Sequence, residues 1–191
     1  LGGGVIGDLG GFCAATYKRG IAFAQLPTTL LAQVDASVGG KLGIDFGGLK
    51  NHVGVFRVPD AVLIDPVFLQ TLPSRELRSG FAEVVKHCLI ADAGKWQQIR
   101  RRDLDRQDWP NLIAHSVAIK KSVTEADPTE RGLRKILNFG HTLGHAIETF
   151  FLETPQHLLH GEAIAVGMLA ESYLSHRRGT LTAAELAQIE E

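Results

Sequence analysis

The chain begins with LGGGVIGDLGGF (residues 1–12), where Gly2, Gly4 and Gly7 are spaced as G-x-G-x-x-G. Glycines at this spacing let the backbone approach a pyrophosphate at the N-terminus of a helix. A cofactor turn of this kind should follow a strand, but only Leu1 precedes Gly2, and no acidic residue stands at the distance expected for ribose binding. The stretch is therefore either a dinucleotide turn or a tight structural turn.

Short apolar runs alternate with helical patterns after this turn. The sequence predicts a helix over residues 6–17, a strand over 21–26, a helix over 28–34 and a strand over 61–64. Strands that alternate with helices are typical of an α/β layer. We expect residues 1–71 to form part of an α/β domain.

The pattern changes after this region, and amphipathic helical patterns follow without a convincing strand between them. The predicted helices cover residues 74–91, 109–123, 136–151, 162–176 and 183–190, with charged loops at 103–108 and 126–132. The sequence therefore predicts a second, all-α domain over residues 72–191.

Composition and charge disfavour several classes of protein. The 191 residues are 45% hydrophobic, which allows a sizeable core, and 20 basic side chains nearly balance 21 acidic ones. This balance argues against nucleic acid or an acidic membrane surface as a partner, and no run of 18 apolar residues suggests a membrane span. Cys13 and Cys88 form no CxxC motif, so we expect a reduced, cytoplasmic protein.

A second glycine cluster, SVGGKLGIDFGGLKN (residues 37–51), carries Lys41 and Lys50. Lysines among glycines suit a loop that wraps an anionic ligand. The alternative is a solvated, flexible loop with two ordinary surface lysines. The composition of the cluster leaves both interpretations open.

Residues 138–145, NFGHTLGH, place His141 and His145 four apart and hence on one face of a predicted helix. His160 stands at the start of the next helix, and Glu83 lies on the first long one. Two imidazoles and a carboxylate are a common ligand set for catalytic zinc, with one position left open for substrate. The alternative is a group of hydrogen-bonded core histidines, and spacing does not tell which of these side chains would bind a metal.

Six blocks of the sequence follow one another in a specific order and spacing. They are GGGVIGDLGGF (2–12), RGIAFAQLPTTLLAQVDASVGGK (19–41), KNHVG (50–54), GFAEVVKH (80–87), LRKILNFGHTLGHAIE (133–148) and LHGEAIAVGM (159–168). Together they resemble the 3-dehydroquinate synthase family over essentially the whole chain. The resemblance implies an N-terminal α/β domain that binds NAD and a helical C-terminal domain that binds metal, in a fragment that lacks the family's N-terminal and C-terminal parts.

The resemblance implies a carbon–oxygen lyase that converts 3-deoxy-D-arabino-heptulosonate 7-phosphate to 3-dehydroquinate and phosphate. This is the second step of the shikimate pathway to aromatic amino acids. NAD is recycled in each turnover: a ring alcohol is oxidised, phosphate is eliminated, the ketone is reduced, the ring opens, and an intramolecular aldol step closes the carbocycle. Zn²⁺ is the implied metal, and Co²⁺ fits the same ligand types.

The resemblance also assigns roles to single positions. It implies that Glu83, His141 and His160 bind the metal and that His145 takes part in proton transfer. NAD binding is implied for Gly4, Val5, Ile6, Gly7, Asp8, Thr28, Thr29, Lys41, Lys50, Phe68, Leu69, Gln70 and Thr71. Substrate contact is implied for Asp35, Lys86, Arg134 and Asn138, and Arg19 is expected to reach the substrate phosphate across the interface of a homodimer.

Three alternatives accompany this hypothesis. Other sugar-phosphate cyclases share the fold, NAD and the metal but act on sedoheptulose 7-phosphate or glucose 6-phosphate; the pocket residues Lys86, Arg134, Asn138 and His145 favour the dehydroquinate synthase activity among them. A metal-dependent dehydrogenase of the glycerol dehydrogenase type would release NADH rather than recycle it. The truncated chain by itself is also interpretable as a non-catalytic module that binds metal or NAD.

Overall fold

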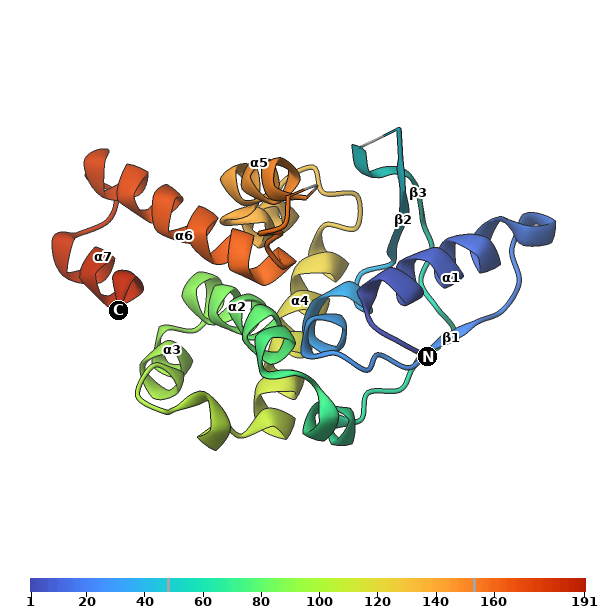
Figure 1. The fold of residues 1–191 in the computed structure, drawn as a ribbon, viewed down its shortest axis with the longest axis horizontal. Coiled ribbons are helices and arrows are strands. Elements are labelled where there is room, and N and C mark those ends of the chain that lie inside the picture. Colours follow the sequence, from blue (N-terminus) through green and yellow to red (C-terminus); the bar gives the residue numbers. More distant parts are fainter. Residues whose placement is uncertain (48, 153) are drawn as a thin grey trace.

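The computed structural model describes residues 1–47, 49–152 and 154–191, and the side chains of Leu49 and Lys50 fall outside that description. The predicted cofactor contact of Lys50 therefore lies outside the described residues. A small N-terminal layer of helix and strands lies beside a larger body of helices (Figure 1). None of the helices in the described part is long and apolar enough to cross a bilayer.

The N-terminal layer begins at the glycine turn. Gly2 donates its N–H to Leu26 O at 3.1 Å and forms an isolated parallel bridge with Pro27. The chain then enters α1 (Gly4–Thr16), which a single 3-10 turn, η1 (Tyr17–Arg19), continues. The helix predicted in this region is confirmed, and the turn before it is anchored to the neighbouring extended segment.

Two short strands form a small sheet in this layer. β1 (Ala24–Gln25) pairs in parallel with β4 (Ala61–Val62). Both strands are shorter than predicted. The residues before β1 find other hydrogen-bond partners: the N–H of Phe23 donates to the Asp60 carboxylate at 2.9 Å instead of a strand. An α/β layer is therefore present, with a small sheet.

The second glycine cluster forms a β-hairpin rather than the loop that the sequence predicts; anion binding by its lysines stays a prediction. β2 (Lys41–Phe46) runs antiparallel to β3 (Leu49–Phe56), and Leu42 lies opposite Val55. Leu42 is 3% exposed because it packs beneath α1, where a Cβ on Gly11 would come within 2.5 Å of its side chain. Apolar residues alternate along both strands and give the hairpin a face to bury.

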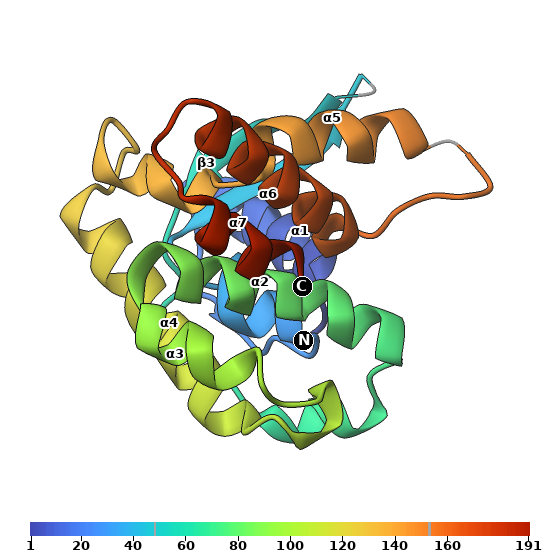
Figure 2. The ribbon, with the colours of Figure 1, turned by 90° about the vertical axis from the view of Figure 1, so that its left-hand side faces the viewer.

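The helical body contains α2 (Ser74–Ala91), α3 (Ala93–Ile99), α4 (Trp109–Ala126), α5 (His141–Phe151), α6 (His160–Arg177) and α7 (Ala183–Glu190). Short helical turns connect the elements: η2 (Ala32–Ala36), η3 (Pro66–Thr71), η4 (Leu104–Arg106) and η5 (Leu133–Asn138). Helices α5 and α6 lie on one side of α2, and α3 lies on the other (Figure 2). The described residues beyond β4 contain no strand, as the sequence predicts.

Two features of the body differ from the sequence prediction. The short helix α3 is not predicted; Asp92 caps it by accepting a hydrogen bond from Lys95 N–H at 2.8 Å. The helix predicted over residues 136–151 is broken into η5 and α5, because Gly140 adopts a φ of +80°, which no right-handed helix contains.

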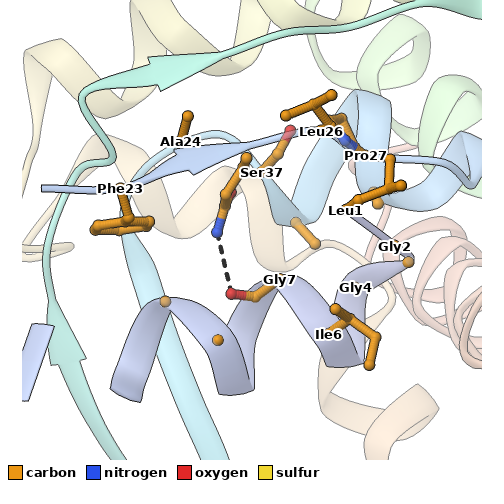
Figure 3. Close-up of a pocket in the computed structure, with 16 residues that line it drawn as sticks. Leu1, Gly2, Gly4, Ile6, Gly7, Phe23, Ala24, Leu26, Pro27 and Ser37 are labelled. Carbon is orange, nitrogen blue, oxygen red and sulfur yellow. Dashed lines mark hydrogen bonds between the residues drawn. The ribbon is translucent and has the colours of Figure 1, made fainter. Parts of the chain in front are cut away.

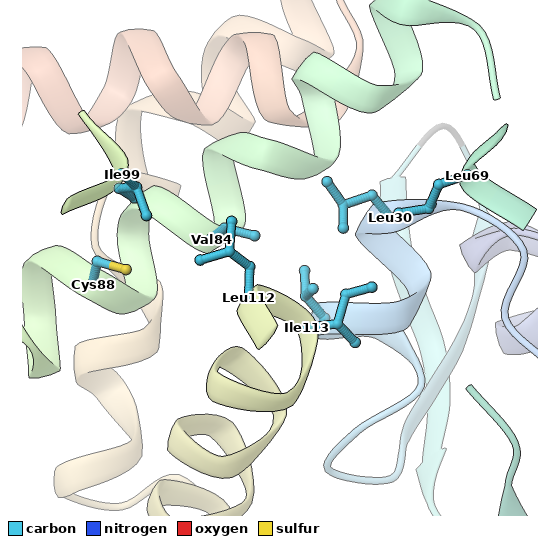
Figure 4. Close-up of a cluster of buried hydrophobic side chains, with 8 residues drawn as sticks. Leu30, Leu69, Val84, Cys88, Ile99, Leu112 and Ile113 are labelled. Carbon is cyan, nitrogen blue, oxygen red and sulfur yellow. The ribbon is translucent and has the colours of Figure 1, made fainter. Parts of the chain in front are cut away.

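One hydrophobic core joins the N-terminal layer to the helical body (Figure 4). Leu30 lies just before η2, and Leu69 lies in η3. Both pack with Val84 of α2 and with Ile113 of α4. The complete cluster is Leu30, Val34, Leu69, Val84, Cys88, Ile99, Leu112 and Ile113. Because this core fixes the segment around η2 against α2 and α4, both parts can contribute side chains to one cavity.

Candidate functional site

Glycines let three helices of the body meet closely enough to share a site. A Cβ on Gly161 of α6 would lie 1.8 Å from Ser79 O of α2, and one on Gly167 would lie 2.0 Å from Gly140 O. No side chain fits at either glycine. The Gly161 N–H instead donates to Ser79 Oγ at 3.0 Å, so the backbones of α2, α5 and α6 are in direct contact.

This packing brings one side chain from each helix to a common point. Glu83 lies one turn after Ser79, and His141 and His160 are the first residues of α5 and α6. His141 Nε2 and His160 Nε2 lie 3.8 and 3.7 Å from Glu83 Oε1. Ligands at about 2.0–2.1 Å from a tetrahedral zinc ion are roughly 3.4 Å apart, so the three atoms surround a space of the size that a metal needs.

Glu83 presents an oxygen without a hydrogen-bond donor. Its side chain is fully buried, and Oε1 has no hydrogen-bond partner among the described residues. The other oxygen, Oε2, forms an ion pair with Lys86, which is 1% exposed. Burying a carboxylate oxygen without a hydrogen-bond donor destabilises the folded protein unless a cation binds to that oxygen. The ligand types and this oxygen therefore fit a divalent ion such as zinc.

Burial and neighbouring charges shift the titration of the three groups. Burial would raise the pKa of Glu83, but Lys86 and the nearby histidines lower it to about 2. Burial, together with Lys86, lowers the pKa of His141 to about 4. Burial would also lower the pKa of His160, but its contacts with Glu148 and Glu83 raise it to about 9. At neutral pH Glu83 is ionised and His141 is neutral, the forms in which each can bind a metal.

Two other groups of side chains come within metal-binding distance of one another. His145, Glu148 and His160 form one, and Asp35, Glu83 and His87 form the other. The first is partly exposed through His145, whereas the second lies deep beside the two lysines that pair with its carboxylates. Lysines pair with both carboxylates of the second group, which disfavours a cation there. In the group of Glu83, His141 and His160, the imidazoles face Oε1, whereas Lys86 pairs with the other oxygen, so this group is the best candidate.

A cavity of about 590 Å³ lies beside this triad, between the helical body and the N-terminal layer. The predicted site residues that line it are Gly4, Val5, Asp8, Asp35, Lys41, Lys86, Arg134, Asn138, His141, His145 and His160. The N-terminus of α1 contributes unpaired N–H groups and the positive end of the helix dipole. With the lysines and the arginine, this wall suits an anionic ligand.

Lys120 is a cavity residue that the sequence analysis missed. Its Nζ donates to both Asp35 O and Asp35 Oδ1 at 2.6 Å. Lys120 follows Ile113 and Ser116 on the buried face of α4. A lysine within an otherwise buried helical stripe is the signal that could have revealed it.

Three further polar or charged lining residues were also missed: Asp45 and Asn51, from the hairpin, and Glu130. Glu130 forms an ion pair with Lys41 and accepts a hydrogen bond from Asn138 Nδ2 at 2.6 Å. The hairpin residues could not be placed while residues 37–51 were interpreted as a loop.

Internal hydrogen bonds hold Arg134 in the wall of the cavity. The residue is 3% exposed, and its Nη1 and Nη2 donate to Pro128 O at 2.9 Å and Gly39 O at 3.1 Å. A Cβ on Gly39 would lie 2.9 Å from this guanidinium group. The arginine side chain is therefore held between Gly39, which precedes the hairpin, and Pro128, in the loop before η5.

Other predicted site residues lie away from this cavity. Ile6 and Gly7 line a second, more apolar pocket of about 220 Å³ between α1 and β1, where Gln25 Nε2 donates to Gly7 O at 3.1 Å (Figure 3). Leu69 belongs to the hydrophobic core, and Arg19 is exposed after the C-terminal end of α1. The predicted site residues that line neither pocket are Arg19, Thr28, Thr29, Phe68, Leu69, Gln70, Thr71 and Glu83, which is fully buried behind His141 and His160.

Comparison with protein families gives a match over the whole chain. The family model described as 3-dehydroquinate synthase N-terminal matches residues 1–79, and the one described as 3-dehydroquinate synthase C-terminal matches residues 80–191. Curated 3-dehydroquinate synthases from Parabacteroides distasonis and Geobacter metallireducens are 47% and 50% identical to the chain, and each match covers 99% of it. The chain spans about half the length of these relatives, 54% and 53% respectively.

Two solved structures have a closely similar fold. A 2-epi-5-epi-valiolone synthase from Streptomyces hygroscopicus subsp. jinggangensis 5008, with NAD⁺ and Zn²⁺ bound, has a TM-score of 0.90 and 34% identity over 98% of this chain and 53% of its own. A 2-deoxy-scyllo-inosose synthase complexed with carbaglucose-6-phosphate, NAD⁺ and Co²⁺ has a TM-score of 0.88 and 31% identity over 100% of this chain and 52% of its own.

These likenesses define the class of the fold, which is that of the sugar-phosphate cyclases. Within that class, the two family models together cover every residue. The chain belongs to the 3-dehydroquinate synthase family.

Proposed function

We propose that this chain carries the central part of the active site of an enzyme that converts 3-deoxy-D-arabino-heptulosonate 7-phosphate to 3-dehydroquinate and phosphate. One observation carries the proposal: a single cavity is lined by the two histidines of a metal-binding triad, by the N-terminus of α1 and by a set of basic side chains. A substrate with a carboxylate, several hydroxyls and a phosphate needs these three kinds of partner together.

Glu83, His141 and His160 would hold a zinc or cobalt ion, and the N-terminus of α1 with Lys41 would contact NAD. The NAD⁺ and Zn²⁺ or Co²⁺ in the two structural relatives support both assignments. When bound, the metal would polarise a substrate hydroxyl, and NAD would exchange two electrons with the carbon that bears it.

The basic side chains would hold the anionic substrate in one orientation. Lys86 is paired with Glu83, and Lys120 is paired with Asp35, so both ammonium groups have fixed positions in the cavity wall. Arg134 is fixed by its bonds to backbone carbonyls. Groups that are already ordered lose little entropy when a ligand binds, which favours precise placement of the reacting carbons.

His145 is the imidazole of the cavity that lies outside the triad. Its ring centroid is 5.1 Å from that of His141 and 5.6 Å from that of His160. About half of its side chain is exposed, at 49%, so the ring can reach a ligand in the cavity. We propose that it exchanges a proton with the substrate, since a histidine beside a metal-bound reactant is well suited to acid–base work.

The proposed enzyme is a homodimer in which Arg19 of each chain completes the site of its partner. The exposed position of Arg19, away from the cavity of its own chain, supports this arrangement. In full-length protein, mixed subunits of Arg19→Ala and Lys86→Ala should regain part of the activity that each variant lacks alone. Mixed subunits that stay inactive would contradict the shared site.

The test of the activity is phosphate release by this chain extended to the length of its relatives, supplied with NAD, zinc and 3-deoxy-D-arabino-heptulosonate 7-phosphate. The proposal expects phosphate release without accumulation of NADH, because the cofactor is recycled. A folded, metal-loaded protein that releases none would contradict it. NADH that accumulates with a simple polyol would indicate a dehydrogenase instead.

A different sugar-phosphate cyclase activity is the second candidate, and the names of the two structural relatives favour it. Their identities of 34% and 31% are lower than the 47% and 50% of the 3-dehydroquinate synthases. Turnover of sedoheptulose 7-phosphate or glucose 6-phosphate, in the same phosphate assay, would support this second candidate.

A further inference from the structure

Glu148 of α5 is buried next to two of the site histidines. It is 3% exposed and does not line the cavity. Its Oε2 lies 3.3 Å from His145 Nδ1 and 3.4 Å from His160 Nδ1. The two imidazoles come from different helices, and their ring centroids are 5.6 Å apart. One carboxylate oxygen is therefore shared between the proposed proton-transfer histidine and a proposed metal ligand.

The chemistry of the carboxylate determines which nitrogen of each ring carries hydrogen. An ionised carboxylate can only accept hydrogen bonds, so Glu148 in that form requires Nδ1 of both His145 and His160 to donate. In a neutral imidazole, which is the form a metal-binding His160 must take, the other nitrogen, Nε2, then keeps its lone pair. For His160 this nitrogen faces Glu83 Oε1 at 3.7 Å, which is the side of the proposed metal.

We propose that Glu148 is a positioning residue that fixes the Nε2 lone pairs of His160 toward the metal and of His145 toward the cavity. The inference rests on the proposed metal site. Its geometric basis is that Glu148 follows His145 by three residues on α5 and also reaches the first residue of α6. A single side chain thus couples the orientation of the ligand to that of the proton-transfer group.

Zinc affinity of the full chain tests the first half of this inference. Carboxylates that orient metal-binding histidines contribute about 10–100-fold to metal affinity. In competition with a chromophoric chelator, Glu148→Ala should weaken zinc binding by about that factor. Glu148→Gln keeps one acceptor oxygen and should recover part of the loss. Thr149→Ala, at the exposed next residue of α5, is the matched control and should bind zinc as the unchanged protein does.

The tautomers of the two rings test the second half without any substitution. Nitrogen–proton correlation spectra of the zinc-loaded protein should show His145 and His160 with the hydrogen on Nδ1. In Glu148→Ala, His145 should shift toward the Nε2–H form that is usual for free imidazole. A role limited to filling space beneath α5 would leave both rings unchanged.

The outcomes separate this inference from the proposed function. Zinc binding that Glu83→Ala abolishes and Glu148→Ala leaves intact would overturn the role of Glu148 alone. Rings that carry their hydrogen on Nε2 in the unchanged protein would do the same. Zinc that persists in Glu83→Ala but is lost in Glu148→Ala would overturn both, because Glu148 would then be a ligand with His145 and His160.

Discussion

Helices α1 and α6 both contain glycines, but these glycines have different surroundings. In α6, Gly161 and Gly167 press against the backbones of α2 and α5, with no room for a methyl group. In α1, a Cβ added to Gly10 would have no neighbour within 4 Å, and one added to Gly7 would meet only the side chain of Gln25. Gly161 and Gly167 bring helices together, whereas Gly7 and Gly10 leave backbone open beside the smaller pocket; Gly11, which packs on Leu42, is the tightly packed exception in α1.

The comparison shows two ways to build a site. The metal triad depends on long-range packing, so its geometry is fixed by a close contact of three helices. The N-terminal layer instead offers backbone N–H groups and an apolar surface, on which Val5 is 80% and Ile6 54% exposed. Changes at the helix contacts of the body should therefore have large effects on metal binding and stability, and changes on the open face of α1, at Gly7 or Gly10, should have small ones.

Loss of Glu83 should have the largest effect. Glu83→Ala removes the only carboxylate of the triad and leaves Lys86 without its buried partner. We expect zinc content, measured after gel filtration, to fall from about one ion per chain to background, and turnover of the extended protein to disappear. Glu76→Ala, two turns earlier on α2, is the control. Full zinc content in Glu83→Ala would contradict the ligand assignment.

A methyl group at Gly161 should break the packing that gathers the triad. The added Cβ would lie 1.8 Å from Ser79 O, which is backbone and cannot rotate away. Gly161→Ala should lower the free energy of unfolding in urea by about 3 kcal/mol, at the upper end of the usual cost of overpacking. A loss of less than about 1 kcal/mol in the free energy of unfolding would contradict this, because α2 and α6 would then move apart easily to admit the methyl group.

Asp8 on α1 should make the stability of the protein depend on pH. Burial, with the charges of Asp35 and Asp45, raises the pKa of Asp8 to about 6, although Lys120 opposes the shift. A carboxyl group with a raised pKa in the folded state makes stability fall as pH increases from about 4 to 6.

Asp8→Asn should therefore gain stability over the unchanged protein as pH rises through this range, by about 1 kcal/mol at pH 7 once solvent screening is allowed for. Urea unfolding at pH 4 and at pH 7 measures the difference. Asp105→Asn, at an exposed position, is the control. A gain that does not grow with pH would contradict the buried setting of Asp8.

The smallest effect is expected at Gly10, the counterpart of Gly161 in α1. Gly10→Ala meets no atom within 4 Å and replaces a flexible residue inside a helix. We expect a gain of about 0.5–1 kcal/mol in the free energy of unfolding, from helix propensity and a less flexible unfolded chain. A loss of stability would mean that α1 is packed more closely than the structure shows.

Local patterns in the sequence predicted much of the body but not its contacts. Helices α2 and α7 begin and end where their apolar periodicity predicts. The break at Gly140 was not predicted, because it depends on the contact with Gly167 of a distant helix. The hairpin of residues 41–56 was missed because its glycines obscured the alternation of apolar residues.

The sequence likewise predicted some parts of the candidate site and missed others. The spacing of His141 and His145 indicated a metal site but left the choice of ligands open, and the resemblance to a family supplied a specific set. Lys120 was missed, since a lysine in a helix is normally solvated and only the tertiary structure shows it against Asp35. Glu148 was not singled out from the sequence, because only the tertiary structure brings it next to His160 of another helix.

The most direct test of the account is anomalous scattering at the zinc edge from crystals of the zinc-loaded protein. We predict one strong peak between Glu83, His141 and His160, at about 2.0–2.2 Å from a carboxylate oxygen and from each Nε2. A peak between His145, Glu148 and His160, or no peak in this part of the cavity, would contradict it.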